Sequence, residues 1–338
     1  MKTINIKITS NHKNINKSSF VFQKWIGISI AFILVVLMVP VILIADNNHT
    51  AAYTNLGVGA RTIAMGNAGT ATTTDVTSAY WNPAGLISLK DLELACLYNI
   101  KMSLDRSYQY AAIGQNYGFG AIALTWVGAT VGDIEGYDEA DNPTGYFDNS
   151  EYNIGFSYAN RYKMLSFGIT PKLYVSSIDN DMKSGIGLDL GLKYDINQYV
   201  VAGLMARDIV GSIDDDNIPY QVSFGLATFP FSGITISADV VKKQDTDAYL
   251  NFGTEYWASI GKDTEANSKL SVVEIKEKTT WQDVLKDTQT GLRLGFNNGV
   301  FACGTGLRFR NLQLDYTYKL NNSEIFSDDH YLSLLVRF

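Results

Sequence analysis

Apolar and polar side chains alternate with a period of two along most of the chain after residue 91. In residues 185–194, for example, isoleucine, leucine and tyrosine alternate with glycine, aspartate and lysine. Successive side chains of a β-strand point to opposite faces, so this alternation gives each segment one apolar and one polar face. Fourteen such segments, separated by turns rich in Asn, Asp, Gly and Lys, are predicted as strands: 92–99, 108–117, 119–127, 151–160, 165–175, 185–194, 200–208, 220–228, 233–241, 249–257, 289–297, 300–309, 312–319 and 330–338.

The length and the polar faces of these segments favour a membrane barrel. A soluble β-sandwich would alternate in the same way. The segments, however, run about 8 to 10 residues, close to the ~9–11 that a tilted strand needs to cross a bilayer. We therefore predict an all-β fold, a transmembrane antiparallel β-barrel of about 14 strands over residues 91–338. Aromatic residues near the segment ends are expected to form interfacial girdles: Tyr158, Tyr174, Tyr194, Tyr220, Tyr256, Trp257 and Tyr318.

The lengths of the connections agree with such a barrel. An even strand count returns both ends of a single-chain bacterial barrel to the periplasm, with the longer loops outside. The predicted outside connections include 128–150, 176–184, 209–219 and 320–329. One connection departs from this rule, because residues 258–288 form a predicted periplasmic insertion. For this insertion, a surface excursion and a docking element for a periplasmic partner are both open.

The last predicted strand ends on an aromatic residue. Leu332, Leu334 and Val336 share one face with the terminal Phe338. A terminal aromatic residue on a strand of this pattern is what the barrel-assembly machinery of bacterial outer membranes recognises. We therefore place the predicted barrel in the bacterial outer membrane, in contact with outer-membrane lipid.

Residues 1–52 are predicted to be a signal peptide. Five lysines and no acidic residue precede the uncharged run Trp25–Ala45, and small residues allow cleavage after Ala45 or Ala52. A permanent transmembrane anchor is the alternative, because this run is near the ~20 residues of a spanning helix. Cleavage after Ala52 would leave 22 basic and 33 acidic residues, a net charge of −11. Such an acidic chain has little attraction for nucleic acid, so we exclude nucleic acid as a partner.

The residue types needed for catalysis are scarce. At most His49 and His330 survive processing, so a His-based triad or metal site is not expected. Asp214–Asn217 could bind calcium through carboxylate oxygens, but it lacks the rest of a binding loop and is interpreted as a solvated turn. Cys96 and Cys303 fall on outward-facing positions of strands that are not neighbours, so no disulfide is expected. We predict a protein that is not an enzyme, with no catalytic residue, no metal and no cofactor.

Residues 53–90 do not alternate and are rich in small residues and turn formers. Asn82-Pro83 and Ala84-Gly85 mark a tight turn. A segment of this kind is predicted to fold as a compact plug into the periplasmic end of the lumen, because small residues let its backbone approach the wall closely. Arg61 is expected to pair with an acidic residue of that wall.

Charged side chains lie on the faces predicted to line the lumen: Glu151, Lys172, Asp189, Lys193, Arg207, Asp239, Glu255, Arg293, Arg308, Arg310, Asp315 and Lys319. One interpretation is a network of mutual pairs that holds wall and plug together, since an unpaired charge in a crowded lumen is costly. The other is a permeation path or a cradle for a ligand. Asp189, Arg207, Glu255, Arg293, Arg308 and Asp315 are the candidate lumen-facing site residues under either interpretation.

The segment before the barrel carries a family resemblance. The runs Gly59-Ala60-Arg61, Met65-Gly66-Asn67-Ala68 and Trp81-Asn82-Pro83-Ala84-Gly85-Leu86 resemble the N-terminal signature of the PorV/PorQ proteins, relatives of the FadL fatty-acid transporters that share the Asn-Pro-Ala element. The resemblance is dense over residues 55–90 and weaker toward the C-terminus. It implies a fourteen-stranded barrel with an N-terminal hatch, whose motif residues are Gly59, Arg61, Met65, Gly66, Asn82, Pro83, Ala84 and Gly85.

Three functions follow as hypotheses. The PorV/PorQ resemblance implies a component of type IX secretion that binds or shuttles exported proteins, with secretion-machinery subunits or cargo proteins as partners. The alternative is a FadL-like channel for the uptake of long-chain fatty acids or other hydrophobic small molecules. A purely structural barrel is the third, because likeness of fold does not settle function.

Overall fold

The computed structural model describes residues 50–179, 181–260, 287–321 and 327–338. The predicted signal run and most of the predicted insertion 258–288 lie outside these residues. Among the helices of the described part, none is both long and apolar enough to cross a bilayer.

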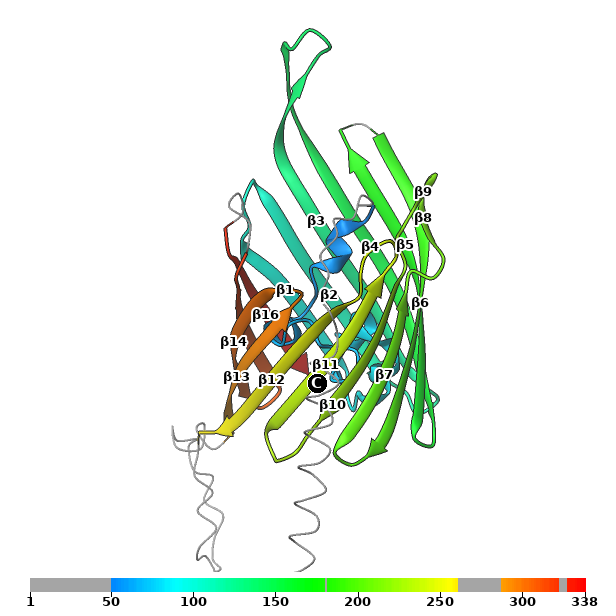
Figure 1. Cartoon of the computed structure of the whole chain (residues 1–338), viewed down its shortest axis with the longest axis vertical. Helices are drawn as coiled ribbons and strands as arrows, with labels where there is room; N and C mark the ends of the chain where they lie inside the picture. The colour runs from blue at the N-terminus through cyan, green and yellow to red at the C-terminus, as the bar shows by residue number, and fades with distance from the viewer. Residues whose placement is uncertain (1–49, 180, 261–286, 322–326) are drawn as a thin grey trace, which may run out of the picture. The chain divides into compact units, whose positions relative to one another are not determined.

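Fourteen antiparallel strands form one closed barrel, in which β1 pairs with β16 and β5 pairs with β6 (Figure 1). This confirms the predicted fold class. The strands are β1 Glu93–Lys101, β2 Arg106–Asn116, β3 Ala121–Tyr137, β4 Pro143–Tyr162, β5 Leu165–Ile178, β6 Asp181–Asn197, β7 Val200–Arg207, β10 Gln221–Thr228, β11 Ile234–Lys243, β12 Tyr249–Ser259, β13 Thr288–Asn297, β14 Val300–Phe309, β15 Leu312–Lys319 and β16 Asp329–Arg337.

The predicted connection 128–150 is wrong, because strands β3 and β4 continue through most of it (Figure 1). Their hairpin is closed by Asp138, whose side chain accepts hydrogen bonds from the backbone N–H groups of Ala140 and Asn142. None of the residues 129–137 of β3 and 143–152 of β4 is buried, so both faces of this part of the hairpin are at least partly exposed. Side chains that meet water on both faces need not alternate, so the period-two pattern stopped before the strands did.

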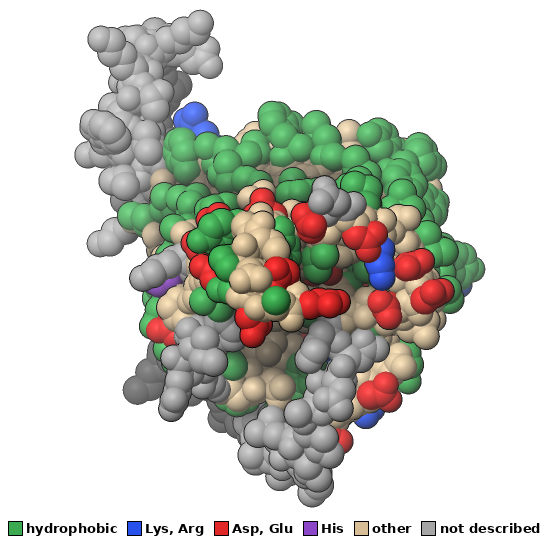
Figure 2. All heavy atoms as spheres, turned by 90° about the horizontal axis from the view of Figure 1, so that it is seen from above, with side chains coloured by type: hydrophobic (Ala, Val, Ile, Leu, Met, Phe, Trp, Pro, Cys, Tyr) green, Lys and Arg blue, Asp and Glu red, His purple; other side chains and the backbone are tan. Residues whose placement is uncertain are grey.

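The connection between β7 and β10 is also partly ordered. It contains β8 Gly211–Ile213 and β9 Asp216–Asn217, and β8 pairs with β6 beyond the end of β7. Seen from above, acidic side chains gather near the middle of this end, and hydrophobic side chains border them along part of the outline (Figure 2).

The facing of the strands follows the alternation. On β6, for example, Leu190 and Leu192 are about two-fifths exposed on the outer surface, while Asp189 is buried inside. Tyr174 and Trp257, predicted as girdle residues, face the lumen: Tyr174 is fully buried, and Trp257 contacts two lumen arginines. Their place in the alternation, not their nearness to a strand end, decided where they point.

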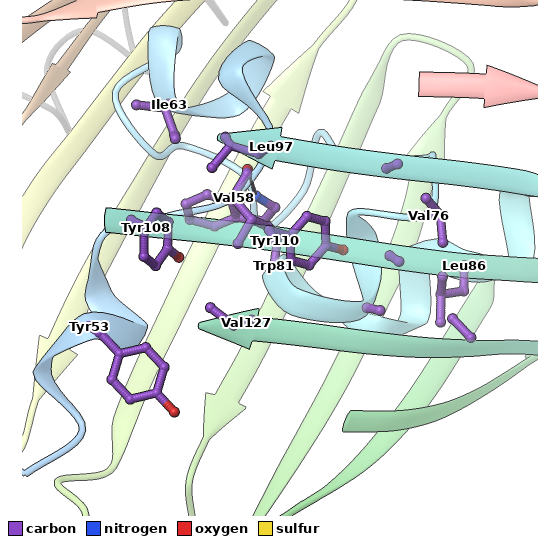
Figure 3. Close-up of a cluster of buried hydrophobic side chains, with 14 of the residues drawn as sticks. Tyr53, Val58, Ile63, Val76, Trp81, Leu86, Leu97, Tyr108, Tyr110 and Val127 are labelled. Atoms are coloured by element: carbon purple, nitrogen blue, oxygen red, sulfur yellow. Dashed lines mark hydrogen bonds between the residues drawn. The ribbon is translucent and has the colours of Figure 1, made fainter. Parts of the chain in front are cut away.

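Residues 50–90, here called the N-terminal segment, pack against the inner face of the barrel. They form four short helices, η1 Ala52–Asn55, α2 Ala60–Ala64, α3 Ser78–Trp81 and η2 Pro83–Ser88. Their apolar side chains, among them Val58, Ile63 and Trp81, join those of strands β1 to β3 in a buried cluster (Figure 3). The segment is therefore held by a core that it shares with the wall.

Glycines let the segment approach the wall. Gly66 has a left-handed backbone with φ 64°, and a Cβ there would collide with the backbone of Phe296. On the wall, a Cβ on Gly295 would collide with the backbone of Gly66. Close contact of two backbones needs glycine on both sides, which explains the small residues of this region.

Candidate functional site

The first buried ion cluster joins the N-terminal segment to strands β12, β13 and β15. Arg61 donates to both carboxylate oxygens of Glu255 at 2.7 Å, and Arg293 donates to the same carboxylate at 2.7 Å. Arg293 Nη1 also lies 2.8 Å from Asp315 Oδ1, as a charge contact without the alignment of a hydrogen bond. We call Arg61, Glu255, Arg293 and Asp315 the Glu255 cluster. It contains two cations and two anions and therefore carries no net charge.

Burial makes this cluster costly to break. The side chains of Glu255 and Arg293 are at most 1% exposed. Burial alone would lower the pKa of Arg61, but the Glu255 carboxylate outweighs it and raises that pKa above its usual value. Removing one partner of a buried pair costs roughly 3–5 kcal/mol, because the other charge remains uncompensated.

A second buried cluster lies on strands β5 to β7. Lys172 Nζ contacts Asp189 at 2.7 Å and Asp208 at 2.6 Å, and the Tyr174 hydroxyl donates to Asp208 at 2.9 Å. Arg207, at the end of β7, donates to the backbone oxygen of Tyr80 at 3.0 Å. We call Lys172, Asp189, Arg207 and Asp208 the Lys172 cluster. Asp208 was missed in the sequence, because the predicted strand 200–208 places it on the face opposite to Arg207, whereas in the structure β7 ends at Arg207 and Asp208 has a left-handed backbone with φ 51°.

Asn82 connects the turn of the N-terminal segment to the wall. Its side-chain oxygen accepts from Ala84 N–H and caps helix η2, which begins with Pro83. Its amide nitrogen donates to the backbone oxygens of Thr70 at 2.8 Å and Leu192 at 3.0 Å. One side chain therefore caps a helix, closes the segment on itself and bonds to strand β6.

The remaining motif residues have structural places in the same segment. Gly59 precedes α2 with φ 72°, and Met65 ends α2 fully buried. Pro83, Ala84 and Gly85 lie in η2, and a Cβ on Gly85 would approach Thr73 O to 2.6 Å. The structure thus places Gly59, Arg61 and Met65 beside β12 to β15, and Asn82 to Gly85 beside β4 to β6.

Arg308 belongs to neither cluster. Its guanidinium donates to the side-chain oxygens of Gln289 and Gln313 and stacks on Trp257 at 4.2 Å from the ring centre. Arg310, predicted to face the lumen, is exposed at the β14–β15 turn and pairs with Asp287. That prediction is wrong because Arg310 has left the strand, so the alternation no longer applies to it.

The N-terminal segment leaves little free space beside it. Three enclosed cavities between the segment and the wall have a volume of about 20 Å³ each. A water molecule needs at least ~10–15 Å³ by this measure, so each cavity holds about one water molecule. None of these three cavities has room for an organic molecule.

The described residues bring together no group of three side chains suited to a metal ion. Cys96 on β1 and Cys303 on β14 are both free thiols, and strands β15 and β16 separate them.

Comparison with known proteins shows similarity of fold. The sequence matches no protein-family model and no curated protein. The structure is similar to the Ralstonia pickettii toluene transporter TbuX, with a TM-score of 0.57 and 14% identity over 84% of this chain and 99% of that one. It is also similar to the CymD monoaromatic hydrocarbon channel, with a TM-score of 0.53 and 13% identity over 84% of this chain and 98% of the other. The Pseudomonas putida toluene transporter TodX aligns with a TM-score of 0.51 and 12% identity, over 83% of this chain and 97% of its own. At these identities the likeness shows the fold alone, the closed antiparallel barrel of these channels.

Proposed function

We propose that this protein is an outer-membrane channel for hydrophobic small molecules, closed by its N-terminal segment. The observation that supports this proposal is that the segment packs against the inner face of the barrel, with only water-sized cavities at three places between them, and is bonded to the wall by a buried ion cluster. A wall used only as a scaffold has no need of a separate segment bonded to its polar inner face. The similar structures are named as toluene and monoaromatic hydrocarbon channels, which supports the same proposal.

In this proposal the N-terminal segment acts as a plug. A molecule the size of toluene does not fit the three cavities beside the segment, so transport along this part of the wall requires the segment to shift or withdraw. The two buried clusters are neutral overall, which means that their charges hold the segment rather than attract an ion. Of the two interpretations of the lumen charges, we adopt mutual pairing for Arg61, Glu255, Arg293 and Asp315.

A disulfide between the N-terminal segment and the wall tests whether the segment must move during transport. Val76 Cγ2 lies 2.9 Å from where a Cβ on Gly114 of β2 would be, close enough for Val76→Cys and Gly114→Cys to form a disulfide. In a Cys96→Ala, Cys303→Ala background, oxidation is expected to stop toluene uptake by cells that lack another channel. Reduction is expected to restore it.

The matched control places the disulfide within the wall. Ser157 and Thr170 are bonded across β4 and β5 at 2.7 Å, so Ser157→Cys with Thr170→Cys leaves the segment unrestrained. This control is expected to transport in both redox states. If the variant with the disulfide between segment and wall takes up toluene equally well when oxidised and when reduced, the segment is not a plug.

A role in type IX secretion stays a prediction from the resemblance of residues 55–90 to PorV/PorQ. Deleting the gene separates the two functions, because the secreted proteome and the uptake of hydrophobic compounds are measured in the same strain. Lost secretion with intact uptake would reject the channel and favour the secretion component.

A further inference from the structure

Seven buried or half-buried tyrosines lie inside the barrel. Five belong to the wall and two to the N-terminal segment: Tyr108, Tyr110, Tyr174, Tyr249, Tyr331, Tyr53 and Tyr80. Four of the wall rings are at most 2% exposed. Tyr108 and Tyr110 lie along strand β2, and Tyr53 of the segment belongs to the same buried cluster (Figure 3).

Two of the wall phenols have no hydrogen-bond partner in the described part of the chain. The hydroxyls of Tyr108 and Tyr110 are both buried and unbonded. An unbonded buried hydroxyl is unfavourable, so its presence needs an explanation. Tyr110 borders one of the water-sized cavities, and both rings belong to the cluster that packs against the segment.

The two segment rings occupy places that recognise a phenol. The Tyr53 hydroxyl accepts a hydrogen bond of 3.1 Å from the side-chain amide of Asn153 on β4, and the ring is 5% exposed. The Tyr80 ring lies against the guanidinium of Arg207, 4.3 Å from the ring centre. A hydrogen-bond donor at the hydroxyl and a cation over a ring are two groups that favour an electron-rich aromatic alcohol.

The charge around these rings excludes an ionised ligand. The Lys172 cluster contributes two cations and two anions, and three of its members line the cavity beside Tyr80 and Asn153. A charged ligand would enter without a counter-charge, which is costly in a buried site. A phenol has a pKa near 10 and is neutral at pH 7.

We propose that Tyr53 and Tyr80 occupy, in the closed barrel, a wall site for neutral phenolic compounds, and that the ring of such a ligand takes the place of Tyr53 when the segment withdraws. This inference rests on the proposed channel function. It narrows the ligand class from hydrophobic molecules to aromatic alcohols, with Asn153 as the residue that selects the hydroxyl.

The test compares 4-methylphenol with toluene, which differ by one hydroxyl, in uptake by cells that carry the protein and no other channel. The native protein is expected to take up 4-methylphenol in preference. Asn153→Leu keeps the size of the side chain but removes the donor, and the preference is expected to fall about threefold to tenfold. Tyr53→Phe removes the competing hydroxyl of the segment, so uptake of both compounds should rise with their ratio unchanged.

Phe156→Leu, on the lipid-facing side of the same strand, is the control and should change neither quantity. Heat-modifiable migration on a gel verifies that each variant is folded. An unchanged ratio in folded Asn153→Leu overturns the phenol site and leaves the channel intact. If no variant takes up either compound, the channel itself fails.

Discussion

Arg61 of the N-terminal segment and Glu255 of strand β12 form a two-bond ion pair, each bond 2.7 Å long, across 194 residues of sequence. Glu255 also holds Arg293 of the neighbouring strand β13. One wall carboxylate therefore neutralises two arginines that come from separate parts of the chain. The position of the segment depends on this carboxylate more than on any of its own short helices, because helices of four to six residues are not stable alone.

Replacing Glu255 by Gln is expected to release the N-terminal segment while the barrel persists. The substitution leaves Arg61 and Arg293 buried without their shared anion, a loss of roughly 3–5 kcal/mol. Limited proteolysis and hydrogen exchange of residues 50–90 measure the effect. Asp195→Asn is the matched control, because its pair with Arg161 is exposed and should contribute at most about 1 kcal/mol. Equal protection of the segment in both variants would contradict the role of Glu255.

A methyl group on Gly295 is expected to displace the segment from the wall. The added Cβ would collide with the backbone of Gly66, and backbone cannot turn aside as a flexible side chain does. Gly295→Ala should therefore raise hydrogen exchange around α2. Gly132→Ala is the control, since the nearest atom to its Cβ, Asp148 Oδ1, would be 3.6 Å away. An unperturbed α2 in Gly295→Ala would show that the contact is looser than described.

Loss of the Asn82 side chain is expected to loosen η2. Asn82→Ala removes a helix cap and the bonds to Thr70 O and Leu192 O, which together are worth about 1–3 kcal/mol. The measurement is the denaturant midpoint for exposure of Trp81, followed by tryptophan fluorescence in a background in which the other four tryptophans are Phe. Asn55→Ala, whose amide makes one exposed bond in the same segment, should shift that midpoint little. A comparable shift in both would argue against a special role for Asn82.

Labelling of the two thiols tests which strand positions point outward from the barrel. Cys96 is exposed on the outer surface of β1, and Cys303 is partly exposed on β14. In membranes, a lipid-soluble maleimide is expected to label both cysteines, and a charged, membrane-impermeant thiol reagent neither. Strong labelling by the charged reagent in intact membranes would contradict a lipid-facing position.

The number and facing of the strands were determined by the sequence alone. Alternation with period two is a local property of an extended backbone, so each of the fourteen predicted segments could be placed without its neighbours. The lumen-facing position of Tyr174 also follows from the alternation, because Tyr174 lies two residues after the lumen-facing Lys172. Its nearness to the strand end had suggested a girdle residue instead. The signature from Gly59 to Gly85 also marked the segment that packs against the inner face of the wall.

The partners across the lumen were decided only by the tertiary structure. Alternation shows that Glu255 and Asp189 point inward, but not that one meets Arg61 and the other meets Lys172. These pairings depend on how the barrel closes and on the path of the N-terminal segment, whose sequence has no regular alternation. The continuation of β3 and β4 beyond the predicted strands was hidden for a related reason, since side chains in water on both faces carry no pattern. The sequence therefore determined which residues form the strands and which way they face, and the tertiary structure determined which residues of the N-terminal segment and of the wall contact each other.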